Sequence, residues 1–189
     1  MHHLPDSILA RHADLTAVRR DIHAHPELAF QENRTAELVA SRLEKAGIEV
    51  HRGIGKTGVV GVLRHGQGSK AIAMRADMDA LPILEKNEFH HVSRHTGCMH
   101  ACGHDGHTTM LLGAAEHLAA QVHAGQAEFD GTVVFIFQPA EEGEGGAPAM
   151  IEDGLFERFP VEAVFGMHNW PGLPVGEFAV HDGPVMASA

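Results

Sequence analysis

The sequence predicts an α/β domain in which helices flank a mixed, mostly parallel β-sheet. Apolar residues recur at helical spacing in several segments, and short β-branched runs bounded by glycine-rich turns alternate with them. The chain has 189 residues, which corresponds to one domain or slightly more. Hydrophobic residues make up 44% and charged residues 21%, a balance that excludes a disordered chain.

Two helices are predicted near the N-terminus. Residues 6–24 carry apolar side chains at helical spacing, and Asp6 is a suitable N-terminal cap. Pro26 ends this helix, because proline disrupts a helix interior. Residues 33–46 form the second helix, and Gly47 stands where a left-handed C-terminal cap is expected.

Three short strands follow, at residues 48–52, 59–63 and 71–76, separated by glycine-rich turns. No periodicity is sustained over residues 77–107. A loop of that length in a compact domain is usually functional or disordered. Apolar residues at helical spacing between positions 110 and 122 then predict a further helix.

The last third of the chain contains three predicted strands and one short helix. Residues 132–137 are β-branched and aromatic, a pattern typical of a strand buried on both faces. A helix is predicted at residues 147–152, and strands are predicted at 161–167 and 176–181.

Charge and cysteine content restrict the function. The net charge of −11 argues against a nucleic-acid partner. No apolar run reaches the roughly 18–20 residues that a membrane span requires, and residues 1–6 lack the pattern of a secretory signal. Two cysteines do not form a disulfide framework, so we expect the protein to be cytoplasmic. From the charge and the lack of an apolar span, we expect it to bind neither nucleic acid nor membrane. The 17 histidines are unusual, but only their positions can separate metal ligands from surface residues.

Ionisable side chains follow three of the predicted strands. Asp77 and Asp79 follow the third strand, Glu141 and Glu142 follow the fourth, and His168 follows the fifth. Ligand sites in open α/β sheets lie outside the carboxyl ends of the strands. We therefore expect these residues to form one site, although polar residues are also common in ordinary loops.

Cys102 and His104 form a second cluster, in the long segment without periodicity. Residues two apart face nearly opposite sides of a regular helix, but Gly103 and Gly106 permit an irregular backbone on which both side chains converge. Thiolate and imidazole ligands suit zinc or a similar first-row metal. The alternative is a buried free cysteine beside solvated histidines.

Glu141 and Glu142 are adjacent, and neighbouring residues of an extended backbone point to opposite sides. One carboxylate is then able to ligate a metal while the other faces a water molecule and accepts its proton. The alternative is an exposed acidic loop. The preceding buried strand, Pro139 and the glycines that follow favour the site.

Five ordered motifs resemble the M20 peptidase family, and specifically its amidohydrolase branch, which includes hippurate hydrolases and auxin-conjugate hydrolases. The motifs are RDIHAHPE at 20–27, RADMDALP at 75–82, MHACGHDGH at 99–107, FQPAEEG at 137–143 and GMHNW at 166–170. They span nearly the whole chain. The resemblance implies a zinc-peptidase-like catalytic domain.

The resemblance also implies the roles of the site residues. Two divalent metal ions (Zn, Mn, Co or Ni) would be held by Cys102, His104, Glu142 and His168. Glu141 would be the general base, and Asp79 would orient a metal-binding side chain or its water. Asp77 lies in the same motif as Asp79 without a definite role, and His23, His25, His100 and His107 are assigned no ligand role.

The implied activity is metal-dependent hydrolysis of the amide bond of N-acyl amino acids, releasing a carboxylate and a free amino acid. A deacetylase of N-acetylated diamino acids and a small-peptide hydrolase are alternatives, and a catalytically incompetent metal-binding fragment is an alternative of another class. Family members are about twice as long, with a lid or dimerisation domain inserted after the segment that resembles residues 183–188. We therefore expect residues 1–189 to be the N-terminal part of the catalytic domain, inactive alone, and the full-length enzyme to be a homo-oligomer.

Overall fold

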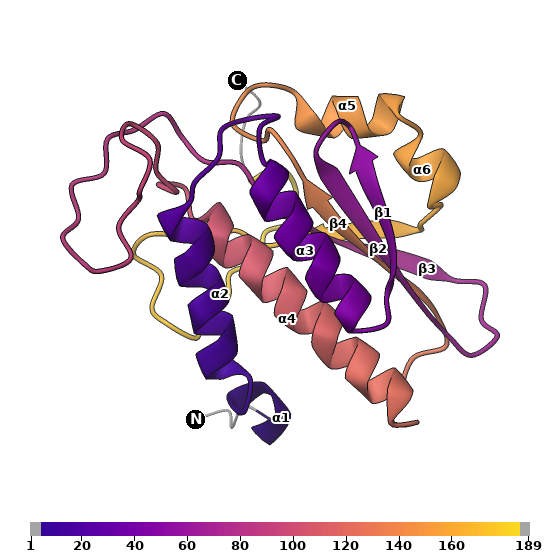
Figure 1. The fold of residues 1–189 in the computed structure, drawn as a ribbon. Coiled ribbons are helices and arrows are strands. Elements are labelled where there is room, and N and C mark those ends of the chain that lie inside the picture. The colour runs from indigo at the N-terminus through magenta and orange to yellow at the C-terminus, as the bar shows by residue number, and fades with distance from the viewer. Residues whose placement is uncertain (1–4, 186–189) are drawn as a thin grey trace.

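A five-stranded mixed β-sheet forms the centre of the computed structural model, which describes residues 5–185 (Figure 1). Its spatial order is β1-β2-β4-β3-β5. β2 is antiparallel to both β1 and β4, whereas β3 is parallel to β4 and β5. Four of the strands therefore share one direction, which confirms the predicted sheet. The bounds are β1 (Glu49–Ile54), β2 (Gly58–His65), β3 (Ala71–Asp77), β4 (Gly131–Gln138) and β5 (Ala163–Gly166).

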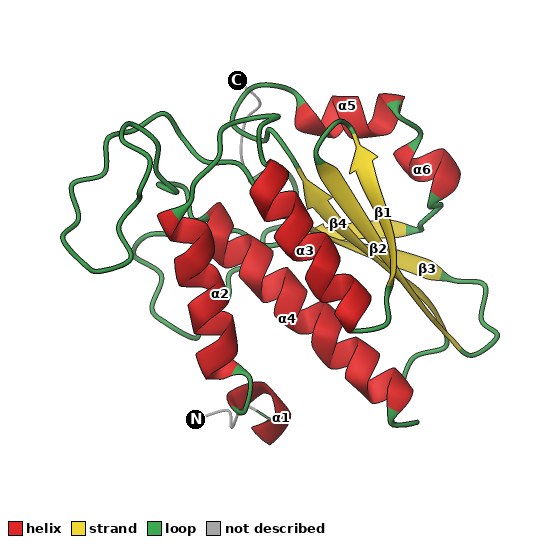
Figure 2. Cartoon of the chain, viewed as in Figure 1, coloured by secondary structure: helices red, strands yellow, loops and turns green. Residues whose placement is uncertain are grey.

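Helices cover both faces of this sheet (Figure 2). The larger core lies under α2, α3 and α4, and the smaller core lies under α5 and α6. The bounds are α1 (Asp6–Leu9), α2 (His12–Ala24), α3 (Asn33–Lys45), α4 (His104–His123), α5 (Gly146–Glu152) and α6 (Leu155–Arg158). The chain is thus a three-layer α/β arrangement with the sheet in the middle.

The central strand β4 connects the two cores. Val133, Phe135 and Phe137 belong to the core under α2–α4, and Val134 and Ile136 belong to the core under α5 and α6. Alternate residues of a strand point to opposite faces, so an unbroken apolar run is required when both faces are covered. The prediction of a strand buried on both faces is confirmed.

The first predicted helix is wrong in one respect, because it is two helices. α1 ends at Leu9 and α2 begins at His12, and the first of them buries no residue. Without a buried apolar face, little favours the continuation of a short helix. The helix predicted at 33–46 is α3, and Gly47 has the expected left-handed backbone with φ of 76°.

Two further predictions require correction. The strand predicted at 176–181 does not form: Phe178 and Val180 are 80% and 95% exposed, and within residues 5–185 no strand pairs with this segment. α4 begins at His104, well before Met110, and α6 was not predicted. Residues 1–4 and 186–189 lie outside the described residues, so the segment at 183–188 is described only in part.

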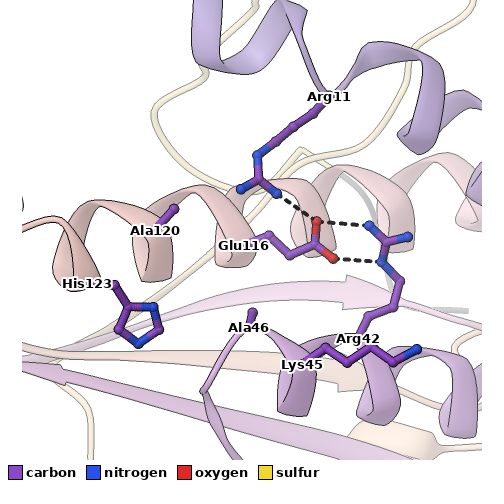
Figure 3. A pocket seen from close by; sticks show the side chains of 7 residues that line it. All are labelled: Arg11, Arg42, Lys45, Ala46, Glu116, Ala120 and His123. Atoms are coloured by element: carbon purple, nitrogen blue, oxygen red, sulfur yellow. Dashed lines mark hydrogen bonds and ion pairs between the residues drawn. The ribbon is translucent and has the colours of Figure 1, made fainter.

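An ion-pair cluster ties the helices of the larger layer together (Figure 3). The carboxylate of Glu116 on α4 accepts hydrogen bonds from Arg42 on α3 and from Arg11, the residue before α2. These residues line a cavity of about 430 Å³ together with Lys45 and His123. Across residues 5–185, no helix combines the length and the apolar character needed to cross a membrane.

Candidate metal centre

The carboxyl ends of the parallel strands meet the start of α4. Asp77 ends β3 and pairs with Gln138 at the end of β4, while His168 follows β5. His104 begins α4 and lies close to Asp77 and Asp79. The structure therefore brings together side chains from three strand ends and from the segment that contains Cys102.

His104 is fully buried at the centre of this cluster. Gly103, which precedes it, has φ of 96°, a left-handed conformation that glycine adopts readily. A Cβ at Gly103 would also lie 2.4 Å from the side chain of Asn169. Nδ1 of His104 lies 3.2 Å from Oδ1 of Asp79, which leaves Nε2 facing the other side chains of the cluster.

Glu141 and Glu142 both approach His104. Oε2 of Glu141 and Oε1 of Glu142 each lie 3.7 Å from Nε2 of His104. The expectation that these carboxylates point to opposite sides is wrong, because the backbone is not extended here. Ala140 has a left-handed φ of 49°, and the chain bends at Glu142.

Cys102 and His168 complete the cluster. Sγ of Cys102 lies 3.3 Å from Nε2 of His168. Within residues 5–185, three groups have donor atoms within 4.8 Å of one another: Cys102, His104 and His168; His104, Glu141 and Glu142; and Asp77, His104 and His107. The first two groups together contain all four predicted ligands and share His104. The roles of these residues stay predictions.

Two unpartnered atoms support a cation at this place. Nε2 of His104 and Oε1 of Glu142 are buried, face each other at 3.7 Å, and have no hydrogen-bond partner among the described residues. Leaving such groups unpaired is costly, and a metal ion between them would satisfy both. The sulfur, nitrogen and oxygen donors present are those that zinc and other first-row metals bind. The residues fit a metal ion.

The electrostatics of the cluster lead to the same conclusion. Burial and the neighbouring carboxylates of Glu142, Asp77 and Glu141 raise the pKa of the Cys102 thiol to about 12. Three carboxylates thus converge on this thiol, and of these Asp77 is paired with Arg75 at 2.6 Å. A bound cation reverses this balance and favours the thiolate that ligates metals.

Sequence reasoning did not give roles to Asp77 and His107, which form a tight buried pair. Nδ1 of His107 lies 2.7 Å from Oδ1 of Asp77, and Nε2 of His107 lies 2.5 Å from Oδ1 of Asn169. Burial disfavours ionisation of Asp77, but the hydrogen bond from His107 and the charges of His104 and Arg75 prevail and lower its pKa to about 2. Because these atoms already have partners, the pair supports the site rather than offering free ligands.

A second buried network lies behind the site. Nδ1 and Nε2 of His23 lie 2.8 Å from Asp105 and 3.1 Å from Glu85, so α2 is joined to the start of α4 and to the long loop. His100 is buried, neither of its ring nitrogens has a hydrogen-bond partner within the described part of the chain, and burial lowers its pKa to about 4. The signal in the sequence for His23, His100 and Asp105 was their position inside the quoted motifs, whereas Glu85 lies outside them.

Comparisons with known proteins bear on the family of the chain. Residues 73–184 match the model of peptidase family M20/M25/M40. The hippurate hydrolase of Campylobacter jejuni is 50% identical over 189 residues, which are 100% of this chain and 48% of that protein. The N-acetylcysteine deacetylase of Bacillus subtilis is 46% identical over 180 residues, 95% of this chain and 46% of that protein.

A solved structure shows the same fold. The dinuclear metal binding peptidase of the M20 family from Bacillus subtilis superposes with a TM-score of 0.86 at 45% identity, covering 93% of this chain and 48% of that one. The present chain thus spans about half the length of the relatives it matches.

A three-layer α/β domain with histidine, cysteine and carboxylate donors gathered at its strand ends defines a domain with a candidate metal centre. The family match covers more than half of the chain and includes the described donor residues. The chain belongs to peptidase family M20/M25/M40.

Proposed function

We propose that the full-length protein hydrolyses the amide bond of N-acyl amino acids in a metal-dependent reaction, with hippurate-like molecules as substrates. The observation that carries this proposal is the pair of buried, unpartnered atoms Nε2 of His104 and Oε1 of Glu142. The likeness to a hippurate hydrolase over the whole chain supports the substrate class.

Two divalent metal ions, zinc, manganese, cobalt or nickel, would be held by Cys102, His104, Glu142 and His168. Such ions polarise the scissile carbonyl and lower the pKa of water. Asp79 would keep the imidazole of His104 in place through its contact with Nδ1, which leaves Nε2 available as the ligand atom.

Glu141 would act as the general base. Its side chain is 39% exposed, against 23% for Glu142. Like Glu142, it approaches Nε2 of His104 to 3.7 Å. It would accept a proton from the attacking water at Oε2 and return this proton to the leaving amine. A base within reach of both groups contributes about 10²–10⁴-fold to the rate.

The test is hydrolysis by the full-length protein after removal of metal with a chelator and addition of zinc, manganese, cobalt or nickel. We expect the chelated protein to be inactive on hippurate and the metal-loaded protein to release benzoate and glycine. Hydrolysis that persists without metal would refute the proposal. Metal binding without turnover of any N-acyl amino acid would instead support the catalytically incompetent alternative.

The acyl group is a separate question. The likeness to an N-acetylcysteine deacetylase favours a second candidate, hydrolysis of N-acetylated amino acids or diamino acids, and small peptides remain a third. A panel of benzoyl and acetyl amino acids and dipeptides, compared by kcat/KM, separates these candidates. We also propose that the enzyme works in the reducing cytoplasm, because both described cysteines are free thiols and Cys102 requires a reduced sulfur to bind metal. That the full-length enzyme is a homo-oligomer stays a proposal that rests on the family resemblance alone.

A further inference from the structure

Three non-glycine residues of the described chain have a left-handed backbone. They are Phe30, Lys56 and Ala140, with φ of 58°, 75° and 49°. They lie in three different connections, between α2 and α3, between β1 and β2, and between β4 and α5. Residues with a side chain rarely adopt this conformation, and it persists only where the surrounding structure holds it.

One carboxylate joins all three connections. Oε1 of Glu32 accepts the backbone N–H of Phe30 at 3.0 Å and that of Ala140 at 2.8 Å. Oε2 of Glu32 accepts the hydroxyl of Thr57, the neighbour of Lys56. The side chain of Glu32 is fully buried, so water does not compete for these bonds.

The connection that begins at Ala140 carries the two glutamates of the site. Its far end is closed on the same residue, because Gly146 donates its backbone N–H to the carbonyl of Ala140 at 2.9 Å. A Cβ at Gly146 would lie 1.7 Å from the carbonyl oxygen of Pro139, so only glycine permits this closure. The backbone of Ala140 therefore sets the direction in which Glu141 and Glu142 leave the sheet.

We propose that Glu32 is a positioning residue whose buried carboxylate fixes the backbone of Ala140 and thereby places Glu141 against His104. The described hydrogen bonds of the Glu32 carboxylate go to Phe30, Thr57 and Ala140 and to none of the donor atoms of the site. The expected effect of Glu32 on turnover rests on the proposed function. Its expected effect on the backbone of residues 139–146 is independent of that function.

Glu27 provides a matched control. Its carboxylate also accepts three hydrogen bonds, from the backbone of Arg34 and from the backbone and hydroxyl of Thr35, at the start of α3. Its described side-chain bonds do not reach residues 139–146. Loss of either carboxylate removes three hydrogen bonds, but only loss of Glu32 should release the loop.

The experiment measures hydrogen exchange of residues 139–146 in the metal-free full-length protein. Glu32→Ala should accelerate exchange there by about tenfold or more, as expected for the loss of a hydrogen bond to a charged group, and Glu27→Ala should not. Glu32→Gln should restore slow exchange, because its amide oxygen accepts both backbone N–H groups and its amide nitrogen donates to the hydroxyl of Thr57. Equal exchange in the two alanine variants, or no restoration by glutamine, would overturn the proposal.

Turnover supplies the second measurement. In the metal-loaded protein, Glu32→Ala should lower kcat with little change in KM, and Glu32→Gln should recover kcat. If Glu32→Ala does not fold, Thr57→Val and Thr57→Ser replace it. Valine removes the hydroxyl that donates to Glu32 and should accelerate hydrogen exchange of residues 139–146. Serine keeps a hydroxyl and should not accelerate it. The same exchange in these two variants would also overturn the proposal. If the unmodified protein hydrolyses no N-acyl amino acid, the proposed function fails while the exchange result still decides the role of Glu32.

Discussion

Oδ1 of Asp79 lies 3.2 Å from Nδ1 of His104 inside the protein, at the nitrogen opposite the proposed ligand atom. Oδ2 of the same carboxylate accepts the backbone N–H of Glu142 at 2.9 Å. The buried side chain of Asp79 therefore holds two proposed ligands, His104 through its ring and Glu142 through its backbone. Metal-binding histidines are commonly oriented by a carboxylate in this way.

We expect Asp79→Ala to weaken metal binding by about 10–100-fold, the usual loss when a partner of a metal-binding histidine is removed. Competition with a chromophoric chelator measures this affinity. Asp79→Asn keeps one side-chain oxygen for one of the two contacts, so its metal affinity should fall less than that of Asp79→Ala. An affinity unchanged in Asp79→Ala would show that His104 needs no carboxylate to orient it.

The adjacent glutamates should respond differently to the same substitution. Glu141→Gln should keep its metal and lose about 10²–10⁴-fold in kcat, because the proton acceptor is gone. Glu142→Gln should lose metal as well as turnover, since an amide is a poorer ligand than a carboxylate. Elemental analysis combined with steady-state kinetics tests both variants. The reverse pattern would exchange the two roles.

The cysteine and histidine at the start of α4 are tested by metal content alone. Cys102→Ser and His104→Ala should each lower the metal-to-protein ratio after dialysis, because a donor atom is lost. Cys98→Ser is the matched control, since Cys98 is the other free cysteine and is absent from the donor groups of the described residues. Unchanged stoichiometry in both ligand variants would reject the assignment.

Stability should depend on pH through His23. The hydrogen bond with Asp105, opposed by burial and reinforced by Glu85, raises the pKa of His23 above its ordinary value. The protonated ring can donate to both carboxylates, whereas the neutral ring can donate only once. Its contribution to the free energy of unfolding is therefore complete below the unfolded pKa of about 6.5 and is lost as the pH rises through the folded pKa.

The measurement is urea denaturation of the unmodified protein and His23→Gln at several pH values. We expect the stability difference between them to shrink from pH 6 to pH 9, because the protonated ring that holds both carboxylates is lost over this range. Titrating groups that do not interact with His23 cancel in this difference to first order, and its carboxylate partners Asp105 and Glu85 have lowered pKa values and stay ionised over this pH range. A stability difference independent of pH would contradict the prediction.

The sequence was most informative where local pattern and tertiary structure coincide. The apolar run of β4 and the acidic residues after β3 and β4 predicted both a buried strand and the place of the site. The bend at Ala140 was not predictable, because it depends on Glu32, which lies 108 residues away in the sequence. Segment 176–181 has an alternating pattern, but a strand requires a partner, and pattern alone does not supply one.

The ion-pair cluster at Glu116 should contribute to stability but not to catalysis. Its carboxylate is 9% exposed and lies 2.6 Å from Nε of Arg42 and 3.0 Å from Nη1 of Arg11, so its loss leaves two guanidinium groups without a partly buried acceptor (Figure 3). We expect Glu116→Gln to lower the free energy of unfolding by about 2–3 kcal/mol. Asp14→Asn, which breaks a pair with the same Arg42 at a carboxylate that is 58% exposed, should cost at most about 1 kcal/mol.

Glu116 lies twelve positions after His104 on α4, about 18 Å along the helix, so metal content and kcat should not change in Glu116→Gln. Equal costs in the two variants, measured by urea denaturation, would show that burial adds nothing to this pair.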